Sequence, residues 1–148
     1  MNETIPSADV PPESPLVLVV DDEPSIRTLL RAILMRAGYR VLVFDCGDEI
    51  LLSPRQPLTE AVCAFVDDAF PGRLNGPQTM AMLHLINPAM KIVPMLGRAW
   101  TEPEKAWIKP HLPNTLYKPF RAEEVLRAVS GVVAARQLPG LPGSGITN

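Results

Sequence analysis

Runs of apolar residues alternate with amphipathic segments along most of this chain. The first run, Leu16–Val20, is wholly apolar and stops at Asp21, which is typical of a strand buried on both faces of a parallel sheet. The next segment begins at Pro24, a residue that suits a first helical turn, and carries apolar residues at helical spacing up to Gly38. This strand and helix order predicts an α/β fold.

The same alternation continues to the end of the chain. The further strands are predicted over Tyr39–Phe44, Ala61–Val66, Lys91–Leu96 and Thr115–Tyr117, and the further helices over Gly47–Ser53, Pro77–Ile86, Glu102–Lys109 and Arg121–Arg136. Prolines at 54 and 57 are expected to end the second helix. Pro94 is awkward inside a strand because proline has no N–H to donate. Together these elements predict a doubly wound, five-stranded parallel sheet with helices on both faces.

One compact domain is predicted over residues 16–136. A flexible, proline-rich lead-in precedes it over 1–15, and a flexible tail rich in proline and glycine follows over 137–148. Hydrophobic residues make up 47% of the chain and charged residues 20%, which is a globular composition.

The net charge and the lengths of the apolar runs disfavour some classes of binding partner and some cellular locations. The formal net charge of -2 disfavours nucleic acid and membrane surfaces as partners. The longest apolar run, Ala61–Val66, is far shorter than the roughly 20 residues that span a membrane, and no secretory signal is visible. We therefore expect a cytoplasmic protein.

Cys46 and Cys63 match no disulfide framework or zinc spacing, and we expect both to be inert buried thiols.

Charged residues follow three of the predicted strands. Asp21 and Asp22 come after the first strand, Asp67 and Asp68 after the third, and Lys118 after the fifth. In open parallel sheets ligands bind beyond the carboxyl ends of the strands, so these side chains are expected to meet at one edge. Glu23 precedes a proline and is interpreted as a helix-start acid.

Acids crowded at one edge repel one another unless a cation lies between them. Mg²⁺ binds one or two carboxylates and keeps waters for a substrate phosphate. A lysine on the opposite side supplies a positive charge for a phosphate oxygen. Acids, metal and lysine around a nucleophilic carboxylate form the outline of a phosphoryl-transfer site. The alternative is that these acids are only solvated strand ends or helix caps. Two acidic pairs and a lysine at three strand ends argue against that interpretation.

Three motifs carry a resemblance to a known family: LVVDDEP (Leu18–Pro24), FVDDAFPGRLNG (Phe65–Gly76) and YKPF (Tyr117–Phe120). The chain resembles the receiver domain of two-component response regulators over Leu16–Arg136. Its PGRLNG stretch is similar to a loop of receivers attached to hybrid histidine kinases. The resemblance implies a flavodoxin-like strand order 2-1-3-4-5.

The resemblance also implies roles for individual residues. Asp67, which lies four residues before a proline as in the family, is implied to accept the phosphoryl group. Asp21 and Asp22 would hold Mg²⁺ directly or through water, and Asp67 and the backbone carbonyl of Ala69 would complete the metal ligands. Lys118 would pair with the phosphoryl group.

The chain departs from the family pattern at two positions. The family has a serine or threonine at the end of its fourth strand, but Leu96 or Gly97 takes that place here, depending on the alignment. The loss of a hydroxyl hydrogen bond to a charged group costs about 1.5–3 kcal/mol. Thr115 replaces the aromatic residue that the family uses in switching. We therefore expect weaker activation, or activation by another route.

The function expected from the resemblance is that of a stand-alone bacterial response regulator in a phosphorelay. Its phosphoryl donor would be a sensor histidine kinase or a phosphotransfer protein. Its output would be contacts with an unknown downstream protein, and a homodimer could form through the face of Glu102–Lys109, Thr115–Tyr117 and Arg121–Arg136. Trp100 and Trp107 flank the first of these segments. No enzymatic activity is expected beyond self-phosphotransfer and self-dephosphorylation.

Three other functions remain open from the sequence. A degenerate receiver would keep the fold as an interaction module that does not depend on phosphorylation, and such a module need not bind Mg²⁺. A magnesium-dependent phosphohydrolase would turn over small phosphate esters, but such enzymes have Asp-x-Asp after the first strand and this chain has Asp21-Asp22. A nucleotide-binding flavodoxin-like protein would need a glycine-rich loop after the first strand, where this chain has acids.

Overall fold

A five-stranded parallel sheet forms the centre of the molecule in the computed structural model, which describes residues 10–69, 71–97, 102–103, 106 and 114–137. Its strands are β1 (Leu16–Val20), β2 (Arg40–Phe44), β3 (Cys63–Asp67), β4 (Lys91–Leu96) and β5 (Leu116–Tyr117). They lie in the order β2-β1-β3-β4-β5, and each adjacent pair is parallel. The predicted fold class and strand order are confirmed.

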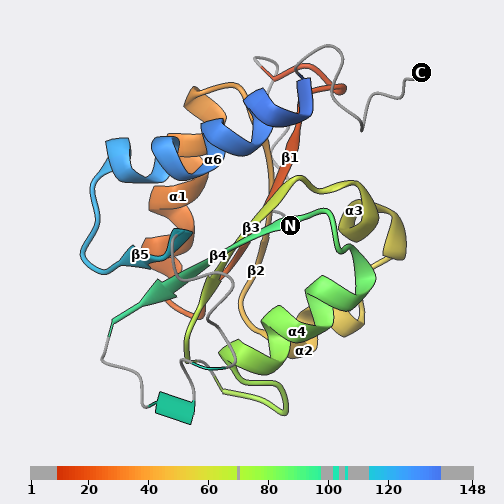
Figure 1. The fold of residues 1–148 in the computed structure, drawn as a ribbon, viewed down its shortest axis with the longest axis vertical. Helices are drawn as coiled ribbons and strands as arrows, with labels where there is room; N and C mark the ends of the chain where they lie inside the picture. The colour runs from red at the N-terminus through yellow and green to blue at the C-terminus, as the bar shows by residue number, and fades with distance from the viewer. Residues whose placement is uncertain (1–9, 70, 98–101, 104–105, 107–113, 138–148) are drawn as a thin grey trace.

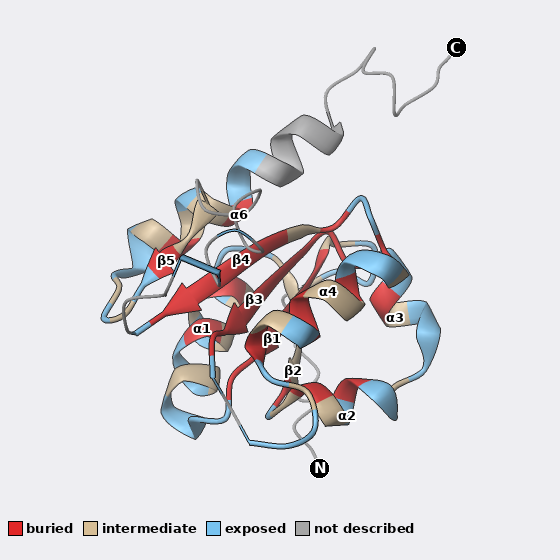
Figure 2. Cartoon of the chain, turned by 60° about the horizontal axis from the view of Figure 1, so that its bottom comes forward, coloured by how far each residue is buried: buried red, intermediate tan, exposed pale blue. Residues whose placement is uncertain are grey.

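Helices cover both faces of this sheet (Figure 1). They are α1 (Pro24–Arg36), α2 (Gly47–Leu51), α3 (Arg55–Glu60), α4 (Gly76–Ile86) and α6 (Ala122–Gln137). Helices α1 and α6 pack on one face through a core that includes Leu34, Phe65 and Val129. Helices α2, α3 and α4 pack on the other face, around Leu18 and Met80. Because both faces are covered, the central strands are buried along their whole length (Figure 2).

Helix α3 was not expected, because Pro54 and Pro57 were predicted only to end the helix over Gly47–Ser53. That helix does end before Pro54, but a further helix, which was not predicted, begins there. Pro54 is the N-cap of α3 and Pro57 is its third residue. The first N–H groups of a helix have no carbonyl partner within the helix, so proline there removes no hydrogen bond. The helix before it, α2, ends at Leu51, two residues earlier than predicted.

Pro94 lies within β4 without interrupting its pairing with β3. The N–H of Lys91 donates to the carbonyl of Val62 on the β3 side. Likewise, the N–H of Asp68 donates to the carbonyl of Met95. Successive residues of a strand direct their backbone groups to opposite neighbours, so Pro94 faces away from β3. On that side β5 pairs with only the last two residues of β4, and the missing N–H costs no bond with β3.

The two cysteines have different environments. Cys63 lies fully buried in β3, and burial raises the pKa of its thiol to about 12. This confirms that Cys63 is buried; that its thiol is inert stays a prediction. Cys46 is only half-buried at the start of α2, so the prediction that it is buried was wrong. Burial also raises the pKa of its thiol.

Some predicted segments lie outside the described residues. These are most of Glu102–Lys109 with both tryptophans, residues 1–9 of the lead-in, and residues 138–148 of the tail. The end of the lead-in is anchored to the sheet, because Arg40 donates its backbone N–H to the carbonyl of Pro15 and its Nε to the carbonyl of Ser14. Among the helices of the described part, none combines the length and the apolar character needed to cross a bilayer.

Asn87 joins the end of α4 to the end of α3. Its side-chain amide is buried and donates to the backbone carbonyls of Leu58, Thr59 and Ala61 at 3.0, 3.1 and 2.9 Å. Asn87→Asp replaces this donor with an oxygen that faces three acceptors. We expect the free energy of unfolding to fall by about 3 kcal/mol, measured by urea denaturation at neutral pH.

The matched control for this variant is Asn75→Asp. Asn75 is the N-cap of α4, and its side-chain oxygen accepts the N–H of Gln78 at 2.8 Å. Aspartate accepts the same bond and favours a helix N-terminus, so the same chemical change should leave stability within about 0.5 kcal/mol there. Equal effects at the two positions would contradict the role given to the Asn87 amide.

Candidate functional site

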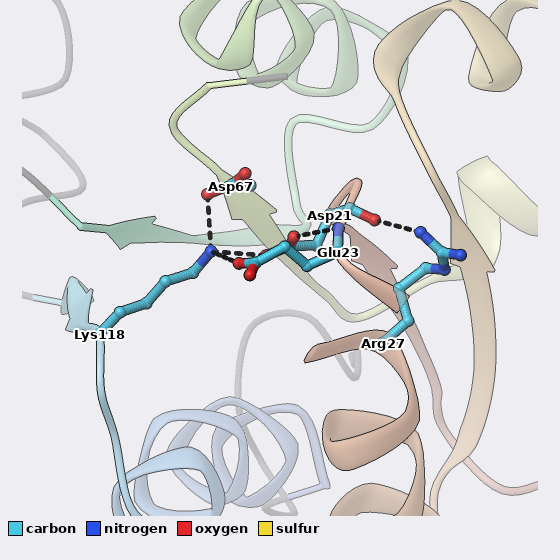
Figure 3. Close-up of polar contacts among 5 residues, drawn as sticks. All are labelled: Asp21, Glu23, Arg27, Asp67 and Lys118. Atoms are coloured by element: carbon cyan, nitrogen blue, oxygen red, sulfur yellow. Dashed lines mark hydrogen bonds and ion pairs between the residues drawn. The ribbon is translucent and has the colours of Figure 1, made fainter. Parts of the chain in front are cut away.

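The predicted acids meet at the carboxyl ends of the two central strands. Val20 of β1 pairs with Val66 of β3, so Asp21 and Asp67 follow the pair side by side. Both carboxylic residues are buried, Asp21 completely and Asp67 with 5% of its surface exposed. Lys118 reaches them from the end of β5 (Figure 3). The structure therefore brings Lys118 into contact with Asp21 and Asp67, which precede it by 97 and 51 positions in the sequence.

The ammonium group of Lys118 connects three carboxylates (Figure 3). Its Nζ lies 2.8 Å from Asp21 Oδ2, 3.0 Å from Asp67 Oδ1 and 3.4 Å from Glu23 Oε1. The Lys118 side chain is largely buried, whereas that of Glu23 is mostly exposed. A single positive charge thus faces two buried negative charges and one exposed negative charge.

Backbone contacts hold Asp21 in place at the start of α1. Its Oδ1 accepts the N–H of Glu23 at 2.9 Å, and its own carbonyl accepts a hydrogen bond from Arg27 at 2.8 Å (Figure 3). Glu23 is the N-cap of α1, which agrees with a helix-start acid, but its side chain makes no cap hydrogen bond. The sequence interpretation missed its contact with Lys118, which no local pattern indicates.

Burial disfavours the charged forms of the two aspartates. It raises the pKa of Asp67 to about 7; the hydrogen bond from Lys118 lowers this pKa, and the negative charge of Asp21 raises it further. Burial also raises the pKa of Asp21. For Lys118 burial acts in the opposite direction, but the hydrogen bonds and charges of the two aspartates outweigh it and raise the pKa. The carboxylates of this cluster therefore favour the binding of a further cation in addition to the ammonium of Lys118.

The donor set suits a hard divalent cation. One carboxylate oxygen from each of Asp21, Asp22 and Asp67 lies within 4.8 Å of the other two. Asp22 is exposed at the outer side of this group. Carboxylate oxygens are the ligands that Mg²⁺ takes up in proteins, usually with several waters retained. Ala69 lies exposed just beyond β3, and the ligand role of its carbonyl stays a prediction.

Asp68 is buried beside this cluster, outside the group of three oxygens. Its backbone N–H donates to the carbonyl of Met95 at 3.1 Å and so extends the pairing of β3 with β4. Asp67 thus belongs to the group of three oxygens and Asp68 lies beside it; the reacting role of Asp67 stays a prediction.

The place opposite Lys118 at the end of β4 is taken by Gly97. Leu96 is buried in the core shared with α4, and its carbonyl accepts the N–H of Lys118 at 2.9 Å. A Cβ added to Gly97 would lie 3.9 Å from Cδ of Lys118, its nearest neighbour in the part of the chain that the structure describes. Of the two alignments left open, the structure therefore favours Gly97 as the position beside the site. The Thr115 hydroxyl, close before β5, is buried and has no hydrogen-bond partner in the described part of the chain.

Gly76 was not singled out from the sequence. A Cβ at this position would lie 2.5 Å from the carbonyl oxygens of both Asp67 and Asp68, a distance that no side chain tolerates. The first turn of α4 therefore packs directly on the backbone of the site. The signal that could have identified it is the Asn-Gly-Pro sequence, in which Asn75 caps the helix and Pro77 occupies its first turn.

Comparison with known proteins agrees with this geometry. A family model described as the response regulator receiver domain matches residues 17–130. The signal receiver domain of a modulated diguanylate cyclase from Desulfovibrio desulfuricans G20 is 27% identical with a TM-score of 0.69, and the match covers 82% of this chain and 94% of that one. A response regulator receiver protein from Sinorhizobium medicae WSM419 is 25% identical with a TM-score of 0.67, over 84% of this chain and 98% of that one.

A more distant structure shows the same fold. The CheY-like receiver domain protein from Methanospirillum hungatei JF-1 is 20% identical with a TM-score of 0.68, over 80% of this chain and 93% of that one. No curated protein matches the chain at a significant level.

Proposed function

This chain belongs to the response regulator receiver domain family of two-component signalling, and on that premise we propose that it accepts a phosphoryl group on Asp67 from a phosphohistidine. The donor would be a sensor histidine kinase or a phosphotransfer protein. The output would be protein–protein contact with a downstream partner, with no turnover of other substrates. The observation that carries the proposal is the position of Asp67, which is buried beside Asp21 and hydrogen-bonded to Lys118.

In the proposed reaction a carboxylate oxygen of Asp67 attacks the phosphorus of the donor. An O–P bond forms as the N–P bond of the phosphohistidine breaks, and the imidazole leaves with its electron pair. Lys118 already lies 3.0 Å from Asp67 Oδ1, so its ammonium is available to a phosphoryl oxygen without crossing the site. Fixed charge placed where negative charge accumulates stabilises the transition state without reorganisation.

Asp21, Asp22 and Asp67 would hold Mg²⁺, and the carbonyl of Ala69 would complete the set. When bound, the ion offsets negative charge on the phosphoryl oxygens. Contacts within the chain hold Asp21 in place for this role. The N–H of Glu23 donates to its carboxylate, and Arg27 donates to its backbone carbonyl.

The test is phosphorylation of the purified chain by acetyl phosphate, followed by intact mass, with Mg²⁺ and with excess chelator. We expect a gain of one phosphoryl group that requires Mg²⁺. No gain with acetyl phosphate or with a panel of phosphorylated histidine kinases would contradict the proposal and favour an interaction module that does not depend on phosphorylation.

Gly97→Ser should strengthen phosphoryl binding. The added Cβ fits, with Lys118 Cδ at 3.9 Å as its nearest neighbour among the described residues, and a hydroxyl on it is expected near the Lys118 side chain that pairs with the phosphoryl group. A hydrogen bond to a charged group contributes about 1.5–3 kcal/mol, so the ratio of phosphorylated to unmodified protein should rise by about tenfold or more at limiting acetyl phosphate.

Two controls separate the hydroxyl from the added volume. Gly97→Ala adds the Cβ without the hydroxyl and should leave the ratio near that of the unmodified sequence. Gly131→Ser makes the same change on α6, where no described residue lies within 4 Å of an added Cβ, and should also leave the ratio unchanged. An equal rise in Gly97→Ala would assign the effect to side-chain volume.

A further inference from the structure

The segment between Asp67 and α4 is held from outside by a carboxylate on α2. Asp48 Oδ1 accepts the backbone N–H groups of Arg73 and Leu74, each at 3.0 Å, and its Oδ2 lies 3.1 Å from the N–H of Arg73. The chain reaches this contact through Gly72, which has a φ of 116°. A Cβ on Gly72 would lie 2.9 Å from Asp48 Oδ1, so glycine is required both for the backbone conformation and for the approach.

The same segment continues directly into the backbone of the site. Asn75 and Gln78 form a reciprocal capping box at the start of α4. The next residue, Gly76, lies so close to the carbonyls of Asp67 and Asp68 that a Cβ would be 2.5 Å from each. Asp48 therefore connects to the phosphoacceptor through four consecutive residues whose backbone is hydrogen-bonded or closely packed.

The start of α2 is itself fixed against α4. A Cβ on Gly47 would lie 2.1 Å from Oγ1 of Thr79, so the side chain of Thr79 packs directly against the backbone of Gly47. Thr79 in turn donates to the carbonyl of Asn75 at 2.8 Å. The hydrogen bonds from Arg73 and Leu74 also lower the pKa of Asp48, which keeps its carboxylate ionised. An ionised acceptor on a fixed helix turn defines where residues 73–75 lie.

We propose that Asp48 is a positioning residue for phosphotransfer, acting through residues 73–76 to set the position of Asp67 and of the carbonyls that follow it. This inference rests on the proposed function of Asp67. Asp48 does not touch the reacting atoms, because its oxygens are used by the backbone of Arg73 and Leu74. Its effect is on the geometry that the metal ligands and the nucleophile share.

The test compares Asp48→Ala, Asp48→Asn and Glu60→Ala in phosphorylation by acetyl phosphate across a Mg²⁺ titration. Asp48→Ala should lower the rate about tenfold and raise the Mg²⁺ concentration needed for half-maximal rate, because displaced reacting groups lose rate steeply. Asp48→Asn keeps an oxygen that accepts both N–H groups and should restore most of the rate. Glu60→Ala removes a carboxylate that pairs with Arg40, in another part of the molecule, and should change neither quantity.

Amide hydrogen exchange and chemical shifts by NMR give a readout that does not require phosphorylation. In Asp48→Ala the amides of Arg73 and Leu74 should exchange faster, and the amide shifts of Asp67 and Asp68 should move with them. If the unmodified sequence takes up no phosphoryl group, the proposed function fails, and these shifts together with Mg²⁺ binding by calorimetry still decide the role of Asp48. Unchanged shifts at Asp67 and Asp68 together with unchanged Mg²⁺ binding, or an unchanged rate in Asp48→Ala, would overturn the inference.

Discussion

The Asp67→Asn variant should gain no phosphoryl group from acetyl phosphate and should at the same time be more stable than the unmodified sequence in the absence of Mg²⁺. The first effect follows because an amide oxygen does not form the acyl phosphate. The second follows from the cost of burying the charge. Burial raises the pKa of Asp67 to about 7, so the folded state disfavours its ionised form.

The size of the second effect comes from the balance of charges in the cluster. Asparagine has nearly the same shape and removes one of two buried carboxylates, while Lys118 keeps Asp21 as a partner at 2.8 Å. One pKa unit corresponds to about 1.4 kcal/mol, and screening at a site that opens to solvent reduces the full shift, so we expect a gain of about 1–3 kcal/mol.

Both effects are measured on one preparation, by intact mass after phosphorylation and by urea denaturation at neutral pH. Asp45→Asn makes the same substitution at the exposed end of β2 and should alter neither quantity. Added Mg²⁺ should reduce the stability difference, because the ion stabilises only the protein that retains Asp67 as a ligand. Loss of stability in Asp67→Asn would show that the contact with Lys118 outweighs the cost of the buried charge.

Lys118→Met should have the opposite effect on stability. It leaves Asp21 and Asp67 buried without the ammonium that lies 2.8 and 3.0 Å from them. Removal of one partner of a buried ion pair costs about 3–5 kcal/mol, because the remaining charge loses both water and its counter-ion. The free energy of unfolding without Mg²⁺ should therefore fall by about 3 kcal/mol, and Mg²⁺ should recover part of the loss.

Lys91→Met is the matched control. Lys91 donates its Nζ to the carbonyl of Ala128 at 2.9 Å, so it makes a partly buried contact with a neutral acceptor. The same substitution there should cost about 1 kcal/mol, independent of Mg²⁺. If Lys118→Met loses no more unfolding free energy than the control, and the loss does not depend on Mg²⁺, then Lys118 acts as a packed side chain and not as a counter-ion.

Several parts of this structure follow from local pattern in the sequence. The apolar run that ends at Asp21 predicted β1 with the bounds that it has, since a strand buried on both faces has no polar position until it leaves the sheet. The bounds predicted for β4, Lys91–Leu96, are also those of the structure. The positions of Asp21, Asp67 and Lys118 follow from that, because residues after parallel strands share one edge.

Other parts were decided by contacts between segments far apart in the chain. The end of α3 is held by the buried amide of Asn87, which donates to the carbonyls of Leu58 and Ala61, 29 and 26 positions away in the sequence. The choice between Leu96 and Gly97 depended on the register of β4 with β5, which directs Leu96 into the core and leaves Gly97 beside Lys118.

The sequence by itself thus determined the alternation of strands and helices, with the exception of α3, and the kinds of charged group at the strand ends, since both depend on periodicity and on residue type. The tertiary structure alone decided that Glu23 contacts Lys118 and that Asp48 binds the backbone of residues 73–74, 25 and 26 positions away. Such contacts depend on side-chain direction and on the approach of separate segments. Neither leaves a periodic signal in the chain.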